Sequence, residues 1–485
     1  MIILGTNSVK DTGYDVANSC RFNAGDSDNM HKTPGSASNR RKFTFSCWIK
    51  KGDITPSADT CLFSGDNSDD NARPDDIRIK DTGKLQVAFR NTNDGVVSTK
   101  RVLRDPSAWM NIVVSIDTEQ STASNRVKIY INGVQETSLE GDGSGDPTYP
   151  SEDHDCTGFG RDTKITVGAR SMDTPDKFFD GYLAEVVYID GLQLAPTSFG
   201  EFDEDSPTIW KPIDVSELTF GTNGFYLDFE ASDNLGNDAN GGTDLTEVNL
   251  AATDSATDSP TNNFAIMNPL LIALGATVPA LTVGNLRVAN TIANKMQASY
   301  SNFAVSSGKW YVEIKMTAGT AFRPGISTLN IGQAEGEAGE NQNSPGLWTE
   351  GWGYFYDDGV LYNDNGDAGG TYAAFAAGDI VSIGLDMDNS KLFFGVNGTW
   401  QNSADPAAGT NSIDISGIAA GSDVAFGAAV ENSSAGATYS DVNFGSPVYA
   451  NSSSAADGNG YGDFEYAPPS GFLALCTKNL GSTGG

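Results

Sequence analysis

Histidine and cysteine are scarce in this chain of 485 residues, and their scarcity argues against several classes of enzyme. The two histidines, His31 and His154, lie in polar stretches with no G-x-S-x-G motif nearby, so a serine hydrolase would lack its base. The five cysteines show no CxxC or CxxH spacing, which argues against a zinc framework or a dense disulfide scaffold. We expect free, buried thiols, with one bridge in the N-terminal half as the alternative.

Basic residues are also few, especially in the C-terminal half. Residues 1–211 contain 23 Lys and Arg against 33 Asp and Glu, a balance of -10, whereas residues 212–485 contain 7 against 30, a balance of -23. A surface of this sign repels phosphate backbones and anionic membranes, so we expect no nucleic-acid partner. No basic flank precedes the short apolar run at the start, and we expect no secretory signal.

Strong helical periodicity is absent, while glycine is abundant at 55 residues and aromatic residues make up 10%. This composition favours short strands joined by turns, and we predict an all-β fold. One hairpin pattern occurs twice, because residues 126–133 and 391–398 each end in Asn-Gly after an alternating strand. The repeat predicts two antiparallel β-domains of related construction. The polar segments 66–76 and 140–162 are interpreted as loops.

We predict a first β-domain at residues 1–230, a connecting segment at 231–285 and a second β-domain at 286–485. Residues 231–261 are rich in Asp, Asn, Gly and Thr, so they cannot bury enough apolar surface to fold alone. They are a linker, or they are ordered only by lying on a neighbour.

Residues 264–283 are uncharged, apolar and long enough to span a membrane. Prolines and glycine interrupt them, so we expect no membrane insertion. A buried interdomain connector or a patch covered by another subunit is favoured, since exposed apolar patches of that size seldom stay uncovered. The predicted contact residues are Phe264, Ile266, Leu270, Leu271, Ile272 and Leu274.

Two family resemblances accompany these motifs. The N-terminal domain resembles the laminin G-like, concanavalin A-type jelly roll at residues 43–50, 109–115, 127–134 and 178–186. The C-terminal domain resembles a SPRY domain at residues 308–314, 351–354, 378–388, 391–398 and 443–445. The resemblances imply two concanavalin A-like jelly-roll β-sandwiches in tandem, joined by an acidic, Gly/Asn/Asp-rich linker. Both families are recognition folds, although a fold by itself does not set function.

Residues 199–212, 221–229 and 258–264 are similar to a tail that follows such jelly rolls in bacteriophage virion structural proteins, especially marine ones. This resemblance implies a non-enzymatic virion appendage of the tail-fibre or knob type, assembled in the host cytoplasm and exposed on the particle. The implied partners are a host-surface glycan or protein and other virion proteins of the tail or capsid. The implied assembly is a homo-oligomer, with three-fold symmetry as in many tail appendages.

Aromatic residues cluster in the second domain. Three of them alternate along one predicted strand and would share a face suited to stacking on a sugar or to a protein hot spot. The alternative is that they fill the core. The predicted ligand-binding residues are Trp348, Trp352, Tyr354, Tyr356, Tyr362 and Tyr372.

Acidic loops of the first domain are candidate calcium sites, since Ca²⁺ takes about six to eight oxygen ligands. Laminin G-like domains often hold calcium at the rim, so the resemblance implies the same here. No loop matches an EF-hand, and a solvated acidic loop is the alternative. The candidate ligands are Asp66, Asp69, Asp70, Asp153 and Asp155.

Glu201 and Asp203 would face the same side if extended, as the carboxylates of concanavalin A-type glucanases do. A glycan depolymerase is therefore one alternative function. A solvated acidic loop is favoured, because the stretch lies between prolines and lacks an apolar strand context, and we assign no catalytic residue. A capsid decoration or purely structural role without a host ligand is the other alternative.

Overall fold

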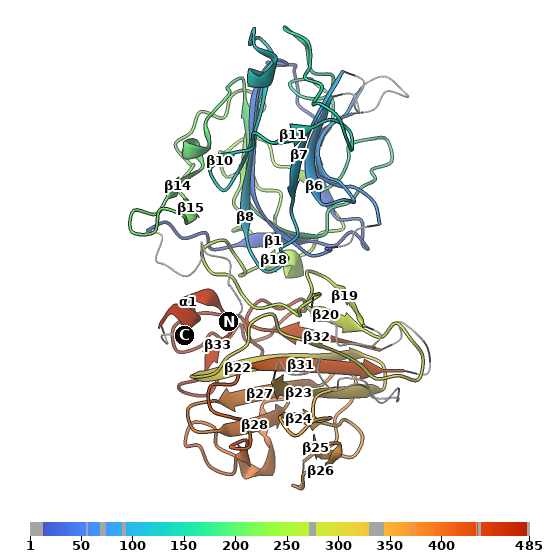
Figure 1. Cartoon of the computed structure of the whole chain (residues 1–485), viewed down its shortest axis with the longest axis vertical. Helices are drawn as coiled ribbons and strands as arrows, with labels where there is room; N and C mark the ends of the chain where they lie inside the picture. Colours follow the sequence, from blue (N-terminus) through green and yellow to red (C-terminus); the bar gives the residue numbers. More distant parts are fainter. Residues whose placement is uncertain are drawn as a thin grey trace. The chain divides into compact units, whose positions relative to one another are not determined.

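The computed structural model describes residues 13–54, 57–67, 74–89, 94–270, 278–328, 344–370, 372–432, 434 and 438–482. It is nearly all β, which confirms the predicted fold class (Figure 1). The chain divides into two compact units, with the boundary between Thr261 and Asn262. Helical structure among the described residues comprises α1 (Thr477–Ser482) and short turns at η1 (Ala123–Asn125), η2 (Pro196–Ser198), η3 (Ala252–Asp254) and η5 (Gln401–Ser403).

The first unit is built from two antiparallel sheets. The first sheet runs β10 (Val134–Gln135), β9 (Val127–Ile131), β8 (Met110–Asp117), β3 (Lys42–Lys51), β13 (Gly181–Asp190), β1 (Ser19–Phe22) and β18 (Ser255–Ala256), and β16 (Phe225–Leu227) also pairs with β13. The second sheet runs β11 (Leu139–Glu140), β7 (Gly95–Val102), β6 (Lys84–Phe89), β5 (Asp75–Ile79), β4 (Thr60–Gly65), β12 (Ile165–Val167), β2 (Asn29–Lys32) and β17 (Thr246–Val248). A separate hairpin joins β14 (Gly200–Phe202) to β15 (Trp210–Pro212).

Aromatic rings fill the core between these two sheets. Phe45 of β3 stacks on Phe63 of β4 with ring centroids 4.7 Å apart, and Phe159 stacks on Phe63 at 5.0 Å. Each large side chain buried in this way contributes about 1.5–3 kcal/mol relative to an exposed position. All five cysteines are free and buried, as the sequence predicts.

The second unit also has two sheets. The larger runs β19 (Ala280–Thr282), β20 (Arg287–Ala289), β32 (Tyr439–Asn443), β22 (Lys309–Ala318), β27 (Ile380–Asp386), β28 (Lys391–Val396) and β29 (Thr399–Trp400), with β30 (Ile413–Asp414) on β28 and β33 (Leu473–Ala474) parallel to β22. The smaller runs β21 (Gln297–Tyr300), β31 (Val424–Glu431), β23 (Ala321–Thr328), β24 (Gly351–Tyr354), β25 (Leu361–Asn363) and β26 (Gly366–Asp367).

The predicted Asn-Gly hairpin occurs in both units. Strands β8, β9 and β10 form one meander, and β27, β28 and β29 form the other. The turn residues Asn132 and Asn397 have φ angles of 48° and 46°, and the glycines after them have 74° and 76°. The side chain of each asparagine accepts a hydrogen bond from the first strand of its meander. Asn132 accepts from the Asn111 N–H of β8 at 2.8 Å, and Asn397 accepts from the Ile380 N–H of β27 at 3.0 Å. The same local sequence therefore builds the same turn twice.

Residues 231–261 lie on the first unit, which is the second of the two alternatives considered for them. Strand β17 pairs with β2, and β18 pairs with β1. Asp258 is buried, where its Oδ2 accepts from Lys50 Nζ at 2.7 Å and its Oδ1 accepts from Trp109 Nε1 at 2.9 Å. Contacts with distant residues supply the order that the polar composition of this segment cannot supply alone. The unit boundary after Thr261 therefore falls within the predicted connecting segment at 231–285.

The apolar stretch at residues 264–283 is partly buried and partly exposed. Phe264 and Ile266 are each 1% exposed within the second unit itself, so they are not available to another subunit. Leu270 is 60% exposed, whereas Leu271, Ile272 and Leu274 lie outside the described residues. In the part of the chain that the structure describes, no helix is long and apolar enough to cross a membrane.

Candidate ligand-binding surfaces

The face of the second sheet that points away from the core of the first unit is polar. On β5 the isoleucines belong to the core, so Asp76 and Arg78 alternate with them on the opposite face. Asp76 lies opposite Ser64 on β4, and Ser64 lies opposite Thr166 on β12. Side chains of these residues form a row across three neighbouring strands, and all of them are buried.

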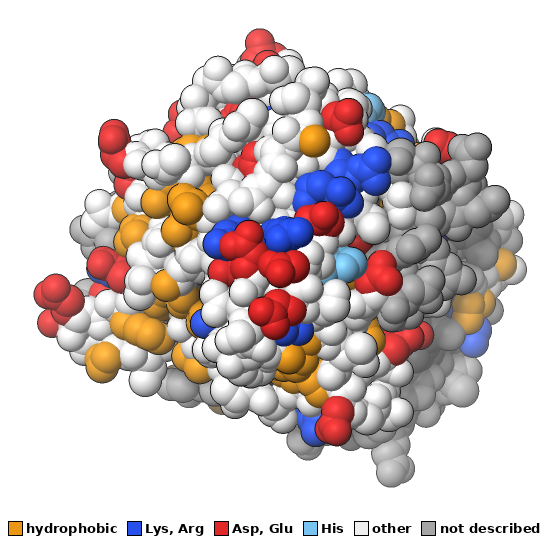
Figure 2. All heavy atoms as spheres, turned by 90° about the horizontal axis from the view of Figure 1, so that it is seen from above, with side chains coloured by type: hydrophobic (Ala, Val, Ile, Leu, Met, Phe, Trp, Pro, Cys, Tyr) orange, Lys and Arg blue, Asp and Glu red, His pale blue; other side chains and the backbone are white. Residues whose placement is uncertain are grey.

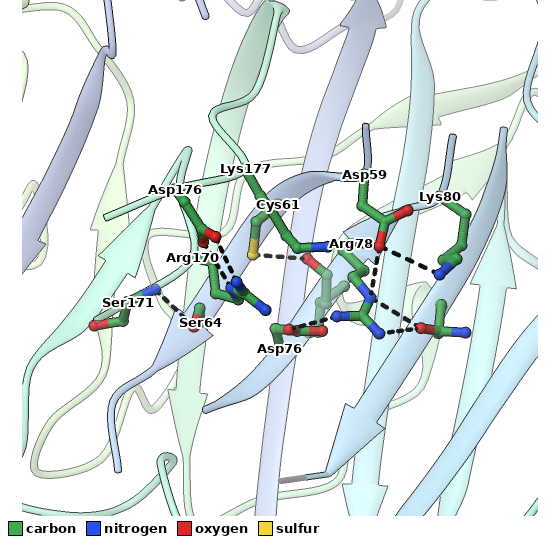
Figure 3. A network of polar contacts seen from close by, with 12 residues as sticks. Asp59, Cys61, Ser64, Asp76, Arg78, Lys80, Arg170, Ser171, Asp176 and Lys177 are labelled. Carbon is green, nitrogen blue, oxygen red and sulfur yellow. Dashed lines mark hydrogen bonds and ion pairs between the residues drawn. The ribbon is translucent and has the colours of Figure 1, made fainter. Parts of the chain in front are cut away.

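Arg78 is the centre of a hydrogen-bond network on this face (Figure 3). Its Nη1 donates to Asp76 Oδ2 at 3.0 Å, its Nε donates to Gln86 Oε1 at 2.9 Å, and the same Nε lies 3.7 Å from Asp59 Oδ2. Gln86 in turn donates to Ser98 Oγ at 2.8 Å. A guanidinium presents its donors in a rigid planar fork, so Arg78 holds side chains from several strands in fixed positions.

Asp59 joins this buried layer to partly exposed lysines. Its Oδ2 accepts from Lys177 Nζ at 2.7 Å and from Lys80 Nζ at 3.2 Å (Figure 3). Burial raises the pKa of Asp59, but hydrogen bonds from Lys177 and the Asp81 N–H, together with both lysine charges, outweigh it and lower the pKa to about 2. Lys80 also lies 3.6 Å from exposed Asp142. The buried carboxylate of Asp59 therefore positions Lys80 and Lys177, and Lys80 in turn contacts Asp142. We call Lys80, Asp142 and Lys177 the charged rim.

Two buried polar atoms in the row, Asp76 Oδ1 and Thr166 Oγ1, have no hydrogen-bond partner among the described residues. Burial raises the pKa of Asp76 to about 6, against the opposing charges of Arg78, Arg170 and Lys177. An unsatisfied buried polar atom costs about 1–3 kcal/mol, and native proteins tolerate few of them. These two atoms are therefore available to accept or donate further hydrogen bonds.

The arrangement differs from the pair of carboxylates that glycosidases use. Strand β5 places one carboxylate, Asp76, beside one guanidinium, Arg78. The carboxylate of Asp59 is within 4.0 Å of three cationic side chains, which neutralise it. The geometry supplies hydrogen-bond donors and acceptors at fixed positions.

Local patterns in the sequence do not reveal this face. Residues 66–76 are predicted to form a loop, whereas strand β5 begins at Asp75. The available signal was the short D-D-I-R-I segment, where Asp76 and Arg78 alternate with isoleucines. The network partners come from strands and loops far apart in the sequence, so no local pattern reveals them.

Two of the predicted calcium ligands bind an arginine instead. Asp153 Oδ1 lies 3.0 Å from Arg41 Nη1, and Asp155 Oδ1 lies 2.8 Å from Arg41 Nε. Hydrogen bonding to Arg41 lowers the pKa of Asp155. Figure 2 shows basic and acidic side chains next to each other on one face of the molecule. Opposite charges at this loop thus neutralise each other.

The other predicted calcium loop is only partly described. Asp66 accepts a hydrogen bond from Thr163 Oγ1 through its main-chain oxygen, and burial raises the pKa of its carboxyl group. Asp69 and Asp70 lie outside the described residues. Within the described ranges no three His, Cys, Asp or Glu side chains are grouped to hold a metal ion.

Most of the predicted aromatic ligand residues contribute to the core of the second unit. Trp352 and Tyr354 of β24 are 6% and 0% exposed, and the rings of Tyr354 and Phe375 are 4.8 Å apart. Tyr356 and Tyr372 pack against the same core while partly buried. These positions match the core-filling alternative, so Trp352 and Tyr354 do not form an exposed stacking platform.

Tyr362 lies on β25 of the smaller sheet, and Trp348 lies in the turn that precedes β24. The Tyr362 ring covers the guanidinium of buried Arg323, 4.4 Å from the ring centroid. A Cβ at Gly353 would meet Arg323 Cδ at 2.8 Å, so the glycine leaves room for the arginine to reach Tyr362. Trp348 accepts from the Asp364 N–H at 3.2 Å through its main-chain oxygen. A ligand-binding role for Tyr362 and Trp348 stays a prediction.

The acidic loop after β14 is held by its own contacts. Lys211 Nζ lies 3.2 Å from Glu201 Oε1 and 3.8 Å from Asp203 Oδ2. Asp203 Oδ1 also accepts from the N–H groups of Asp205 and Ser206, at 3.0 and 2.8 Å. Asp203 therefore stabilises a turn, and Glu201 is exposed on a hairpin outside both main sheets.

Comparison with known proteins identifies both domains. The model of the concanavalin A-like lectin/glucanases superfamily matches residues 25–191, and the SPRY domain model matches residues 309–405. No curated protein matches the chain.

Three solved structures share parts of this fold. The SPRY domain of human HERC1 is 17% identical, with 31% of this chain and 83% of that chain covered and a TM-score of 0.23. A human SPRY domain is 15% identical, with coverages of 34% and 93% and a TM-score of 0.22. A heptameric SAP-like pentraxin from Limulus polyphemus is 14% identical, with coverages of 38% and 80% and a TM-score of 0.26. The chain thus contains a concanavalin A-like, lectin-type domain followed by a SPRY domain.

Proposed function

We propose that this chain is a non-enzymatic recognition protein of a virion, of the tail-fibre or knob type, and that its first unit binds a host-surface glycan. The supporting observation is the charged rim of Lys80, Asp142 and Lys177, which the buried residues Asp59 and Arg78 hold from beneath. Sugar hydroxyl groups need several donors and acceptors at fixed positions, and a pre-ordered rim lowers the entropy cost of binding.

The charges of this rim alternate in sign, which suits a neutral or zwitterionic sugar better than a polyanion. Asp142 accepts from Gln86 Nε2 at 3.1 Å, and this hydrogen bond lowers the pKa of Asp142, so its carboxylate remains an acceptor at neutral pH. Lys80 and Lys177 supply donors within the same cluster. The described residues of this site include no free carboxylate pair, which favours binding without cleavage.

The virion setting and the partner proteins rest on the sequence resemblance of residues 199–212, 221–229 and 258–264 to bacteriophage structural proteins. The partners proposed on that basis are other virion proteins of the tail or capsid. Locating this chain in density on an intact particle would test the setting, because tail, capsid and fibre tip imply different roles.

Binding to a glycan array tests the function itself. We expect Lys177→Met and Asp142→Asn to weaken binding of the retained glycan at least tenfold, whereas Asp162→Asn, on an exposed loop of the same unit, should leave it unchanged. Silence on the array combined with tight binding to a virion protein would favour a structural role instead. New reducing ends on incubation with host polysaccharide, abolished by Glu201→Gln or Asp203→Asn, would favour a depolymerase.

A further inference from the structure

Strand β19 is the outermost described strand at one edge of the larger sheet in the second unit. The sheet order begins at β19, whose inner side pairs with β20. An edge strand presents backbone N–H and C=O groups to any strand that approaches, and soluble proteins usually protect such edges with charges, prolines or bulges. The three residues Ala280, Leu281 and Thr282 carry no charge.

The edge lies within an unusually long charge-free segment. No Asp, Glu, Lys, Arg or His occurs between Asp258 and Arg287. Two apolar side chains that precede β19 are well exposed, Leu270 at 60% and Val278 at 41%. A protein with a net charge of -33 has many acidic residues available for its surface, yet this segment contains none of them.

The exposed apolar side chains are held by ordered backbone. The Leu270 N–H donates to Asn268 Oδ1 at 2.9 Å. The main-chain oxygen of Val278 accepts from Thr291 Oγ1 at 3.0 Å and from Gln297 Nε2 at 2.9 Å. These contacts order the main chain at both residues.

The nearest charges inward from the edge cancel each other. Arg287 of β20 donates from Nε to Asp441 Oδ1 at 2.6 Å and from Nη2 to Asp441 Oδ2 at 2.9 Å. The guanidinium also lies 4.4 Å from the ring centroid of Tyr439. An approaching molecule therefore meets a locally neutral surface at β19.

We propose that β19 pairs with β19 of a second copy of this chain, in an antiparallel, two-fold symmetric dimer that extends the larger sheet. Residues 262–485 contain 7 basic and 20 acidic residues, a balance of -13, so two copies repel each other over most of their surface. The repulsion is weakest at a neutral patch, and this edge provides one. Pairing of a strand with itself across a two-fold axis makes each contact twice.

Molar mass in solution tests the dimer directly. The purified full chain at micromolar concentration should have about twice its monomer mass of 51.1 kDa by light scattering or sedimentation. Leu270→Lys combined with Val278→Lys should raise the dissociation constant at least a hundredfold. The control Leu192→Lys replaces a leucine that is 42% exposed in the first unit, and it should leave the mass unchanged.

Cysteine cross-linking gives a further readout that does not depend on affinity. The native cysteines are buried, so an exposed Thr282→Cys should form a covalent dimer with a short bis-maleimide cross-linker, which spans the roughly 7–8 Å between diagonal positions on paired antiparallel strands. Thr399→Cys, on the exposed edge strand β29 at the other side of the same sheet, should not. A monomer at tens of micromolar, a trimer, or equal cross-linking at both positions would each overturn the proposal.

Discussion

Breaking the buried ion pair between Lys50 and Asp258 is expected to destabilise the first unit severely. The two side chains are 0% and 2% exposed, and 2.7 Å separates Nζ from Oδ2. Asp258→Ala removes the carboxylate that pairs with the Lys50 ammonium, which costs about 3–5 kcal/mol. It also leaves the buried Trp109 Nε1–H without its acceptor at 2.9 Å, at a further cost of about 1–3 kcal/mol. We therefore expect a loss of at least about 4 kcal/mol.

The same reasoning predicts strong non-additivity. Lys50→Met should cost about 3–5 kcal/mol, because it leaves the carboxylate of Asp258 buried without its cation. The double variant Lys50→Met/Asp258→Leu should recover to within about 3 kcal/mol of the wild type, since an apolar pair of similar volume avoids the desolvation of two charges while Trp109 Nε1–H still lacks its acceptor. A loss equal to the sum of the two single variants would contradict this reasoning.

The assay must report on the first unit alone, because a chain of two units need not unfold in one step. Urea unfolding followed by hydrogen exchange or pulse proteolysis, read on peptides from residues 94–261, meets this need. A free energy of unfolding for Asp258→Ala within about 1 kcal/mol of the wild type would refute the assignment of the pair as a buried anchor.

Two further predictions follow from buried groups. Burial raises the pKa of Glu185 to about 8, above the value of about 4.3 in an unfolded chain, so its stabilising effect is full below about pH 4 and is lost as the pH rises to about 8. Glu185→Gln should flatten the dependence of stability on pH across this window in thermal melts, and an unchanged profile would contradict the shift. Gly325→Ala places a Cβ 2.0 Å from Trp352 O and should cost about 1–3 kcal/mol, whereas Gly417→Ala, with no described atom within 4 Å, should lower the melting temperature little.

The strand pattern of this site can be predicted from the sequence, whereas the hydrogen-bond partners of its residues cannot. The alternation of Asp76 and Arg78 with isoleucines is readable from the sequence, although the surrounding Asp-rich segment obscured it. The partner Asp59 is 118 residues from Lys177, so their contact depends on which strands and loops meet. Short-range patterns carry no information about such pairs.

The sequence by itself determined the all-β class, the two domain types and the repeated hairpin. These features depend on a period of two along each strand and on the backbone preferences of Asn-Gly, both of which act within a few residues. Only the tertiary structure decided whether an aromatic side chain such as Tyr354 lies in the core or on the surface. It likewise decided that residues 231–261 are ordered, because their stability comes from Lys50 and Trp109, which are distant in sequence.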